Sequence, residues 1–595
     1  MLLRLIPCLL CAWLLAAADA DPLRSDFAAR LAKIPEDQVD RRVDLARWAR
    51  GKGLSTDADR ILEAVIALKP EHQAARKALG YEKVGGEWLR GEPLWVAKKW
   101  VRYLGRYMSP AEKKRIISRR DSMREQLRAR QGWAKAWETK TAHFAIKSNC
   151  PVRVVEDIRT AMEQYYAVAA RMFNLGSTSA KIPVEVFADQ DAFMQASLDD
   201  RIAVHENILG YYVPRKDLIR CFYAGSLDQT LGTLFHETTH LIVNRFAKRE
   251  VPTWTNEGLA VYFEDAERRE DRVDPDAIPW TRLWHLRDMM REGKVNLEGT
   301  VACSHAAYTV EYYPRGWSLT HFLMQGGDKK LRKGYENYLM SLKKGGDGSA
   351  TELFTKGIGR SPGDLQSDWE KHVLAIEPRT ADELAAAAKA ALGSYLDPQQ
   401  AGEYAEKAVE LAGDNWRCHA ALGAVRLAQC RLYGKAELAA GAVEAYDRAV
   451  ELSGATAASI KAKVKSGQSM SYWTGLLADR MFALEAAGLG ERAAEAAGEL
   501  LEIDEANAYA YALLGVMGAD DPAERAEADI LLATAKDVGY DHLVRWCLAR
   551  VAALDGKGAE VRTLLTEAME LDRLGLGRAW YPREIERLTK AAPKR

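Results

Sequence analysis

Two histidines spaced four residues apart place the strongest constraint on how this chain folds. They lie within residues 231–244 in the order His236-Glu237-Thr-Thr-His240. Four residues make slightly more than one turn of an α-helix, so both imidazoles project from one face and can converge on one metal ion. Residues 226–229, just before this stretch, have the form of a helix capping box. Apolar residues fill most other positions, and the sequence therefore predicts a core helix that carries a two-histidine site.

A third ligand and a general base complete the site that the sequence predicts. Glu237 is rotated by about 100° from His236 on such a helix, so its carboxylate can reach a metal-bound water without binding the metal. A catalytic zinc site needs a third protein ligand and an open position for that water. Glu257 follows His240 after a gap that suits a loop and a return on a second helix. We therefore expect Zn²⁺ held by His236, His240 and Glu257, with Glu237 as the base.

The two motifs together resemble those of the gluzincin zinc peptidases, most closely the peptidase-MA-like group of bacterial proteins. The second helix of that family carries N-E-G-[LFA]-[AT], which residues 256–260 match, with its glutamate on zinc. The resemblance covers residues 136–378 of the 595-residue chain and implies an α+β zincin-like domain there. Thr255 stands where the family usually has leucine. Glu264 matches a family position that can hydrogen-bond a zinc histidine, and Asn244 is a second candidate for supporting the ligands.

Peptide hydrolysis also needs a group that stabilises the oxyanion formed when water attacks the carbonyl. Gluzincins often use a tyrosine or histidine on a later helix. Tyr313, four residues before a tryptophan, resembles the family's tyrosine. Tyr312, Tyr308 and His321 remain alternatives.

The activity that this resemblance implies is a zinc-dependent endopeptidase acting on protein or peptide substrates, and two alternatives stay open. The first is an aminopeptidase of the gluzincin group, which normally also has a G-x-M-E-N strand. The nearest string here, Ala-Val-His-Glu-Asn at residues 203–207, lacks the glycine and the methionine. The second is a catalytically idle, zinc-containing module whose helical repeats bind a partner. Intact Glu237 argues against that module.

The chain is too long for one hydrophobic core, and its pattern indicates three parts after the first 20 residues. Residues 21–135 are helical and repeat-like, with a hairpin expected at 81–89 and a basic run at 98–130. That run is either a surface for anionic polymers or, as we favour, a solvated connecting helix. Residues 379–595 read as tetratricopeptide-like helical repeats, which can bind a protein partner or complete a neighbouring core.

Helical and strand patterns mark individual elements within these parts. Ala58, Leu62 and Val65 have the spacing of a tetratricopeptide helix, as do positions around Leu422-Gly423 with Tyr446, and weakly Leu514-Gly515. In the central part we expect a helix at 152–172 and strands, listed in chain order, at 141–147, 183–187, 209–213 and 218–223. The strand at 218–223 or its partner is the expected edge for a bound peptide.

The first 20 residues indicate export. A short basic start is followed by an apolar run and small residues at 18–20, the pattern of a signal peptide, so we expect a periplasmic or secreted protein. Export permits a disulfide, which we expect among Cys150, Cys221 and Cys303. Equal numbers of basic and acidic residues, 84 each, give no sign of nucleic-acid binding. No later segment is apolar enough to span a membrane.

Overall fold

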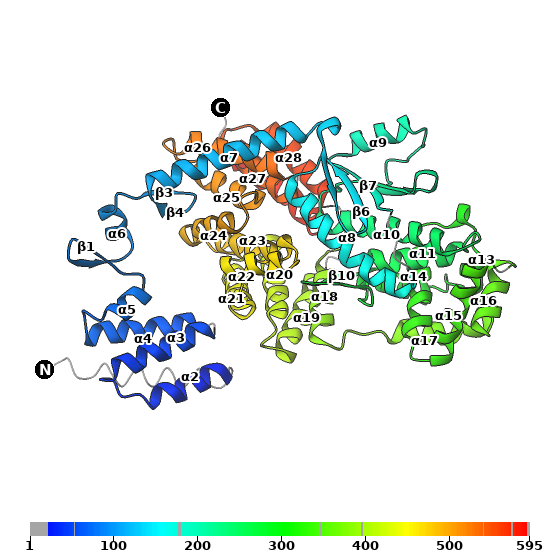
Figure 1. The fold of residues 1–595 in the computed structure, drawn as a ribbon, viewed down its shortest axis with the longest axis horizontal. Helices are drawn as coiled ribbons and strands as arrows, with labels where there is room; N and C mark the ends of the chain where they lie inside the picture. Colours follow the sequence, from blue (N-terminus) through cyan, green and yellow to red (C-terminus); the bar gives the residue numbers. More distant parts are fainter. Residues whose placement is uncertain are drawn as a thin grey trace. The chain divides into compact units, whose positions relative to one another are not determined.

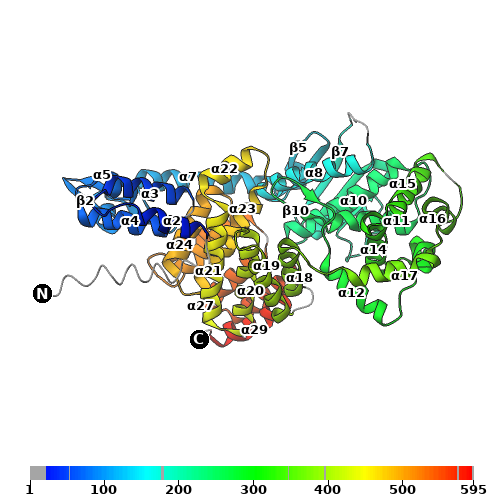
Figure 2. The same cartoon turned by 90° about the horizontal axis from the view of Figure 1, so that it is seen from below.

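The fold is given by a computed structural model that describes residues 22–52, 54–175, 180–345, 347–393, 397–539, 541–572 and 575–591. The chain divides into two compact units, Met1–Ile117 with Val450–Gly454, and Ser118–Ala449 with Ala455–Arg595. Figures 1 and 2 show their elements from two directions. The expected signal peptide lies outside the described residues. The first boundary falls inside a helix near residue 117, whereas the sequence placed it at 135.

The first unit begins with packed helices and continues into short hairpins. Its elements are α2 (Pro22–Ala32), α3 (Val39–Gly51), α4 (Ser55–Leu68), α5 (Gln73–Ala78), β1 (Glu82–Val84), β2 (Glu87–Leu89), α6 (Glu92–Ala97), β3 (Val101–Tyr103) and β4 (Arg106–Met108). The predicted apolar face of α4 is confirmed, because Ala58, Leu62 and Val65 are buried in the core that α4 forms with α3.

Of the two hairpins in this unit, the sequence predicted the first but not the second. The first is confirmed: β1 pairs antiparallel with β2 around Gly85 and Gly86. Their φ angles of 60° and 96° are the left-handed values that a two-residue hairpin turn requires. The basic run at 98–130 is not one helix, however. Residues 101–108 form the β3–β4 hairpin around Leu104-Gly105, and only then does α7 (Pro110–Arg130) begin.

The second unit contains a mixed sheet with strand order β5-β6-β7-β9-β8. The strands are β5 (Trp137–Lys140), β6 (Phe144–Ser148), β7 (Ile182–Phe187), β8 (Gly210–Val213) and β9 (Leu218–Phe222). β6, β7 and β9 run parallel, while β5 and β8 are antiparallel to their neighbours. The expected strands are present, and α8 (Val152–Met172) matches the expected helix. β5 was not expected from the sequence. The sheet ends at β5 and at β8, and β9 is paired on both sides, so β8 is the edge strand of the two that were expected to align a peptide.

The next elements are helices and one further hairpin, of which the first helix lies between β7 and β8 and the others follow the sheet. They are α9 (Gln190–Asp199), α10 (Leu227–Phe246), α11 (Thr253–Glu264), β10 (Glu267–Arg268), β11 (Val273–Asp274), α12 (Trp280–Arg291), α13 (Leu297–Ala302), α14 (Tyr312–Gln325), α15 (Lys329–Lys344), α16 (Ala350–Ile358) and α17 (Pro362–Ala375). α10 packs on β8, β9 and α8. The hydroxyl of Ser226 accepts the Gln229 N–H at 3.1 Å, so the side-chain cap that starts α10 is in place.

The rest of the second unit is helical. Its helices are α18 (Ala381–Gly393), α19 (Pro398–Leu411), α20 (Trp416–Tyr433), α21 (Ala436–Ser453), α22 (Ala457–Lys465), α23 (Met470–Ala486), α24 (Gly490–Ile503), α25 (Ala508–Gly518), α26 (Arg525–Val538), α27 (His542–Leu554), α28 (Gly558–Leu571) and α29 (Gly577–Ala591). A Cβ on Gly423 would lie 2.8 Å from the Tyr446 ring, and one on Gly515 would lie 2.6 Å from Leu532. Both glycines therefore permit close helix packing. The tetratricopeptide likeness itself stays a prediction.

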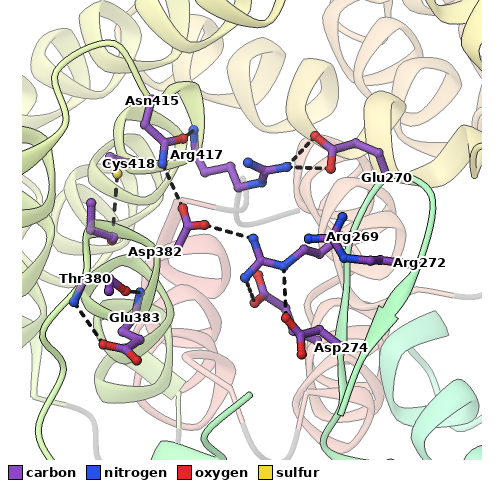
Figure 3. Close-up of polar contacts among 12 residues, drawn as sticks. Arg269, Glu270, Arg272, Asp274, Thr380, Asp382, Glu383, Asn415, Arg417 and Cys418 are labelled. Atoms are coloured by element: carbon purple, nitrogen blue, oxygen red, sulfur yellow. Dashed lines mark hydrogen bonds and ion pairs between the residues drawn. The ribbon is translucent and has the colours of Figure 1, made fainter. Parts of the chain in front are cut away.

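Ion pairs join the segments of the second unit. Arg120 and Arg124 of α7 bind Glu527 and Asp537, so basic residues of this helix are used inside the unit. Figure 3 shows a second junction, where Arg269, next to β10, lies between Asp274 and Asp382 of α18. Its guanidinium reaches Asp382 at 2.8 Å, and Arg417 of α20 binds the Glu270 carboxylate. These contacts explain why residue 378 is not a boundary between compact units.

Two further expectations concern cysteines and membranes. Cys150, Cys221 and Cys303 are free thiols, so the expected disulfide is wrong. Cys150 and Cys221 are fully buried, and the Cys150 thiol donates to the Phe187 carbonyl at 3.5 Å. Within the described ranges, no helix combines the length and the apolar character needed to cross a membrane.

Candidate metal centre

Close helix crossings bring the predicted ligands together. A Cβ added to Gly232 of α10 would lie 3.1 Å from the backbone oxygen of Glu264, at the end of α11. A Cβ added to Gly258 of α11 would lie 2.6 Å from the backbone oxygen of Gly316 on α14. Only glycine leaves room for such approaches. The residues beside these glycines on α10, α11 and α14 are therefore held close together.

His236, His240 and Glu257 form the group of side chains in the described chain whose ligand atoms all lie within 4.8 Å of one another. The Nε2 atom of His236 lies 3.4 Å from Oε2 of Glu257, and Nε2 of His240 lies 3.6 Å from the same oxygen. Ligand atoms bound at about 2.1 Å to one tetrahedral zinc ion are separated by about 3.4 Å. The nitrogen and oxygen donors are also those that zinc prefers, so the three residues fit this ion.

The charges around the group favour a cation. Burial works against a charge on His236, but hydrogen bonds to Glu257 and Glu264 outweigh it and raise the pKa of this histidine well above its usual value. Burial likewise opposes a charge on Glu257, yet His236 and His240 lower its pKa. The carboxylates thus stay ionised and stabilise positive charge between them. A bound divalent cation would take the place of the proton on His236.

The carboxylate of Glu264 makes a hydrogen bond to His236, and Arg282 in turn makes a hydrogen bond to that carboxylate. The Nδ1 atom of His236 lies 2.8 Å from Oε2 of Glu264, as the sequence predicted. The other oxygen of Glu264 accepts a hydrogen bond of 2.7 Å from Arg282 of α12. Arg282 also binds Asp265, the next residue of the chain. Burial alone would raise the pKa of Glu264, but Arg282 and His236 lower it to about 2, so this carboxylate remains an acceptor.

The second histidine has no such support. Nδ1 of His240 is buried and has no hydrogen-bond partner among the described residues. Asn244, one turn further along α10, donates instead to the Tyr212 hydroxyl at 3.1 Å. In the described part of the chain, Glu264 therefore makes the hydrogen bond to a ligand histidine, and Asn244 does not.

The proposed base and oxyanion donor lie beside the group. The ring of Tyr313 is 6.2 Å from that of His236, between centroids. Burial, and then the charge of Glu257, raise the pKa of Tyr313 to about 12, and Glu237 adds to this effect. Tyr313 therefore keeps its proton near neutral pH and can donate it in a hydrogen bond. Glu237 is half-buried, and among the described residues no hydrogen bond or ion pair engages its carboxylate.

The three alternatives to Tyr313 have other contacts. The Tyr308 hydroxyl donates to the backbone oxygen of Tyr312 at 3.0 Å. Tyr312 lies under the Arg315 guanidinium, 4.5 Å from its ring centroid. His321 is buried, and its Nδ1 lies 3.0 Å from Nε2 of His372. The geometry favours Tyr313 among the four.

Sequence reasoning missed Arg282. It lies 18 residues after Glu264, with no motif around it, and only the packing of α12 brings it to the end of α11. Its one signal is an arginine on a helix whose neighbouring segment is acidic, which is too common to single out.

No family model and no curated protein matches this sequence. The resemblance to gluzincins therefore stays a prediction, carried by the residues themselves.

Proposed function

We propose that this protein is a zinc-dependent endopeptidase. The observation that carries the proposal is the convergence of His236, His240 and Glu257 at separations that fit one tetrahedral ion. An unengaged glutamate, Glu237, and a protonated tyrosine, Tyr313, lie next to them. A structural metal site needs neither residue.

The chain's residues divide the chemistry of peptide hydrolysis among them. When bound, zinc supplies a Lewis acid that polarises the scissile carbonyl and lowers the pKa of a water towards 7. Glu237 takes the proton from the attacking water and passes it to the leaving amine. Tyr313 donates a hydrogen bond to the developing oxyanion. His236, His240 and Glu257 hold the ion, and Glu264 fixes the ring of His236.

An edge of the sheet supports the proposal of a peptide substrate. β8 is an edge strand, and it packs on the helix that carries both histidines. We expect an extended peptide to pair with this edge by strand addition. The N-terminal pattern supports export to the periplasm or the medium, and the C-terminal helices offer a surface for a protein partner.

The test is zinc content and casein cleavage by the purified full chain. Near one zinc per chain, with cleavage that 1,10-phenanthroline abolishes and added Zn²⁺ restores, would support the proposal. Hydrolysis of amino-acid amides without cleavage of casein would favour the aminopeptidase. Stoichiometric zinc with no turnover of any unfolded protein would favour the idle binding module.

A further inference from the structure

Arg282 connects two consecutive carboxylates at the end of α11. Its Nη2 donates to Oε1 of Glu264 at 2.7 Å, and its Nε donates to Asp265. The same side chain of Glu264 uses its other oxygen for Nδ1 of His236, at 2.8 Å. Arg282 thus lies one contact away from a predicted zinc ligand, although it touches no ligand itself.

This arrangement fixes the orientation of His236. A carboxylate with one free oxygen can rotate about its terminal bond, whereas Glu264 is held at both oxygens by groups on two different helices, α10 and α12. The planar guanidinium suits this task because it presents several donors in a rigid fork. With Glu264 fixed, Nδ1 of His236 has a fixed partner and Nε2 is directed towards Glu257.

Arg282 also balances charge. Glu264 and Asp265 are both partly buried, with about 28% and 29% of their side chains exposed. Two adjacent carboxylates in such a place repel each other, and the Arg282 cation between them offsets that repulsion. Without it, Glu264 would gain by turning towards water and away from His236.

We propose that Arg282 is a positioning residue for metal binding, which holds Glu264 against His236 and so directs that histidine to the ion. This inference rests on the proposed zinc site. The arginine acts through Glu264 and not on substrate. Supporting contacts of this kind contribute roughly 10- to 100-fold to metal affinity.

A neighbouring cavity makes the inference testable by chemical rescue. A cavity of about 670 Å³ is lined by Asp265, Trp280 and Arg282 on one side and by Asp382 and Ala386 of α18 on the other. None of the three predicted ligands lines it. If Arg282 is shortened to alanine, a guanidinium ion can enter from this cavity and occupy the place of the missing side chain.

The experiment measures zinc affinity of the full chain by competition with a fluorescent chelator. Arg282→Ala should weaken zinc binding roughly 10- to 100-fold. Guanidinium chloride, at concentrations too low to unfold the protein, should recover much of that loss, whereas sodium chloride at equal ionic strength should not. Arg282→Lys, which keeps the charge but lacks the fork, should fall between the parent and Arg282→Ala.

Arg269→Ala is the matched control. Arg269 lines the same cavity and forms ion pairs with three carboxylates, Glu267, Asp274 and Asp382, but it does not contact Glu264. Its loss should leave zinc affinity within about twofold of the parent. If Arg282→Ala does not fold, Arg282→Gln, which is shorter than arginine but keeps part of the side chain and an uncharged donor, replaces it, and thermal unfolding of the metal-free forms verifies the fold.

The possible outcomes separate the two proposals. Parent-like zinc affinity in Arg282→Ala, or an equal loss in Arg269→Ala, would overturn the role of Arg282 while leaving the zinc site intact. A loss that guanidinium does not rescue, with reduced stability of the metal-free protein, would also overturn it in favour of a purely structural role. A parent that binds no zinc would instead overturn the proposed function, and the inference with it.

Discussion

The hydroxyls of Thr255 and Tyr338 lie 2.6 Å apart in the fully buried core beside α11. Thr255 is the residue at which the sequence departs from the gluzincin pattern, and the Tyr338 hydroxyl gives its polar side chain a partner. Each hydroxyl would be costly to bury alone, because a buried polar group without a hydrogen bond loses its interaction with water. The departure is therefore compensated within this core.

A double-mutant cycle tests that compensation. Thr255→Val leaves the Tyr338 hydroxyl unpaired, and Tyr338→Phe leaves the Thr255 hydroxyl unpaired, so each should lower the free energy of unfolding by about 1–3 kcal/mol. The double variant should lose less than the sum of the two, because both hydroxyls are gone. Chemical denaturation of the metal-free protein measures all three. Strictly additive losses would show that the two hydroxyls do not stabilise each other.

Each of the three predicted ligands should be needed for zinc. His236→Ala, His240→Ala and Glu257→Ala each remove one of the three donors, so zinc retention after dialysis should fall sharply in all three. His285→Ala, which removes an exposed histidine from α12, is the control and should retain zinc like the parent. Elemental analysis makes the measurement. Full zinc in Glu257→Ala, with loss in Asp265→Ala, would assign the third ligand to another carboxylate.

Tyr313 should act mainly in the transition state. Tyr313→Phe removes only the hydroxyl, so kcat should fall by roughly 10- to 1,000-fold with little change in KM. Tyr312→Phe is the matched control, since its ring lies under Arg315 and its substitution should leave kcat near that of the parent. Steady-state kinetics on a peptide substrate decide between them. Unchanged kcat in Tyr313→Phe with a large loss in Tyr312→Phe would reverse the assignment.

Buried His321 and its half-buried neighbour His372 should make stability depend on pH. Burial, and then the neighbouring His372, lower the pKa of His321 to about 4, and burial also lowers the pKa of His372. An unfolded histidine takes up a proton below about pH 6.5, whereas folded His321 does not until about pH 4. The free energy of unfolding should therefore fall as pH drops from 6.5 to 4.

For His321 alone this linkage is worth about 2 kcal/mol between pH 7 and pH 5. His321→Gln should reduce the difference between these two pH values by about that amount. Denaturation in the presence of a chelator measures it without contribution from a bound metal. An identical pH dependence in parent and variant would contradict the shifted pKa.

The parts of the site that lie on α10 and α11 could be predicted from the sequence, because each is indicated by residues that are close together in the chain. Helix α10 can be recognised in the sequence from the spacing of its apolar residues, the cap at Ser226 and the two histidines one turn apart. Glu257 is recognisable because it follows His240 after a gap that suits a loop and because residues 256–260 resemble the family's second zinc helix. The contact of Glu264 with His236 follows from the regular geometry of α11 once the two helices cross.

The remaining parts depend on contacts between distant segments. Arg282 reaches Glu264 only because α12 packs where it does. The β3–β4 hairpin was hidden by basic residues that also suit a helix, while its turn at Leu104 requires a positive φ that this residue type rarely adopts. The disulfide was expected from redox compartment alone, which permits a bond without placing two sulfurs together.

The most direct test of the central claim compares the parent with Glu237→Gln. Glutamine keeps the size of the side chain but cannot accept the proton that the attacking water must lose. Zinc content and thermal stability should match those of the parent, because among the described residues Glu237 makes no hydrogen bond or ion pair that the change would break. Cleavage of an unfolded protein should fall by about 10²- to 10⁴-fold. Equal cleavage by parent and variant, with equal zinc, would contradict the account.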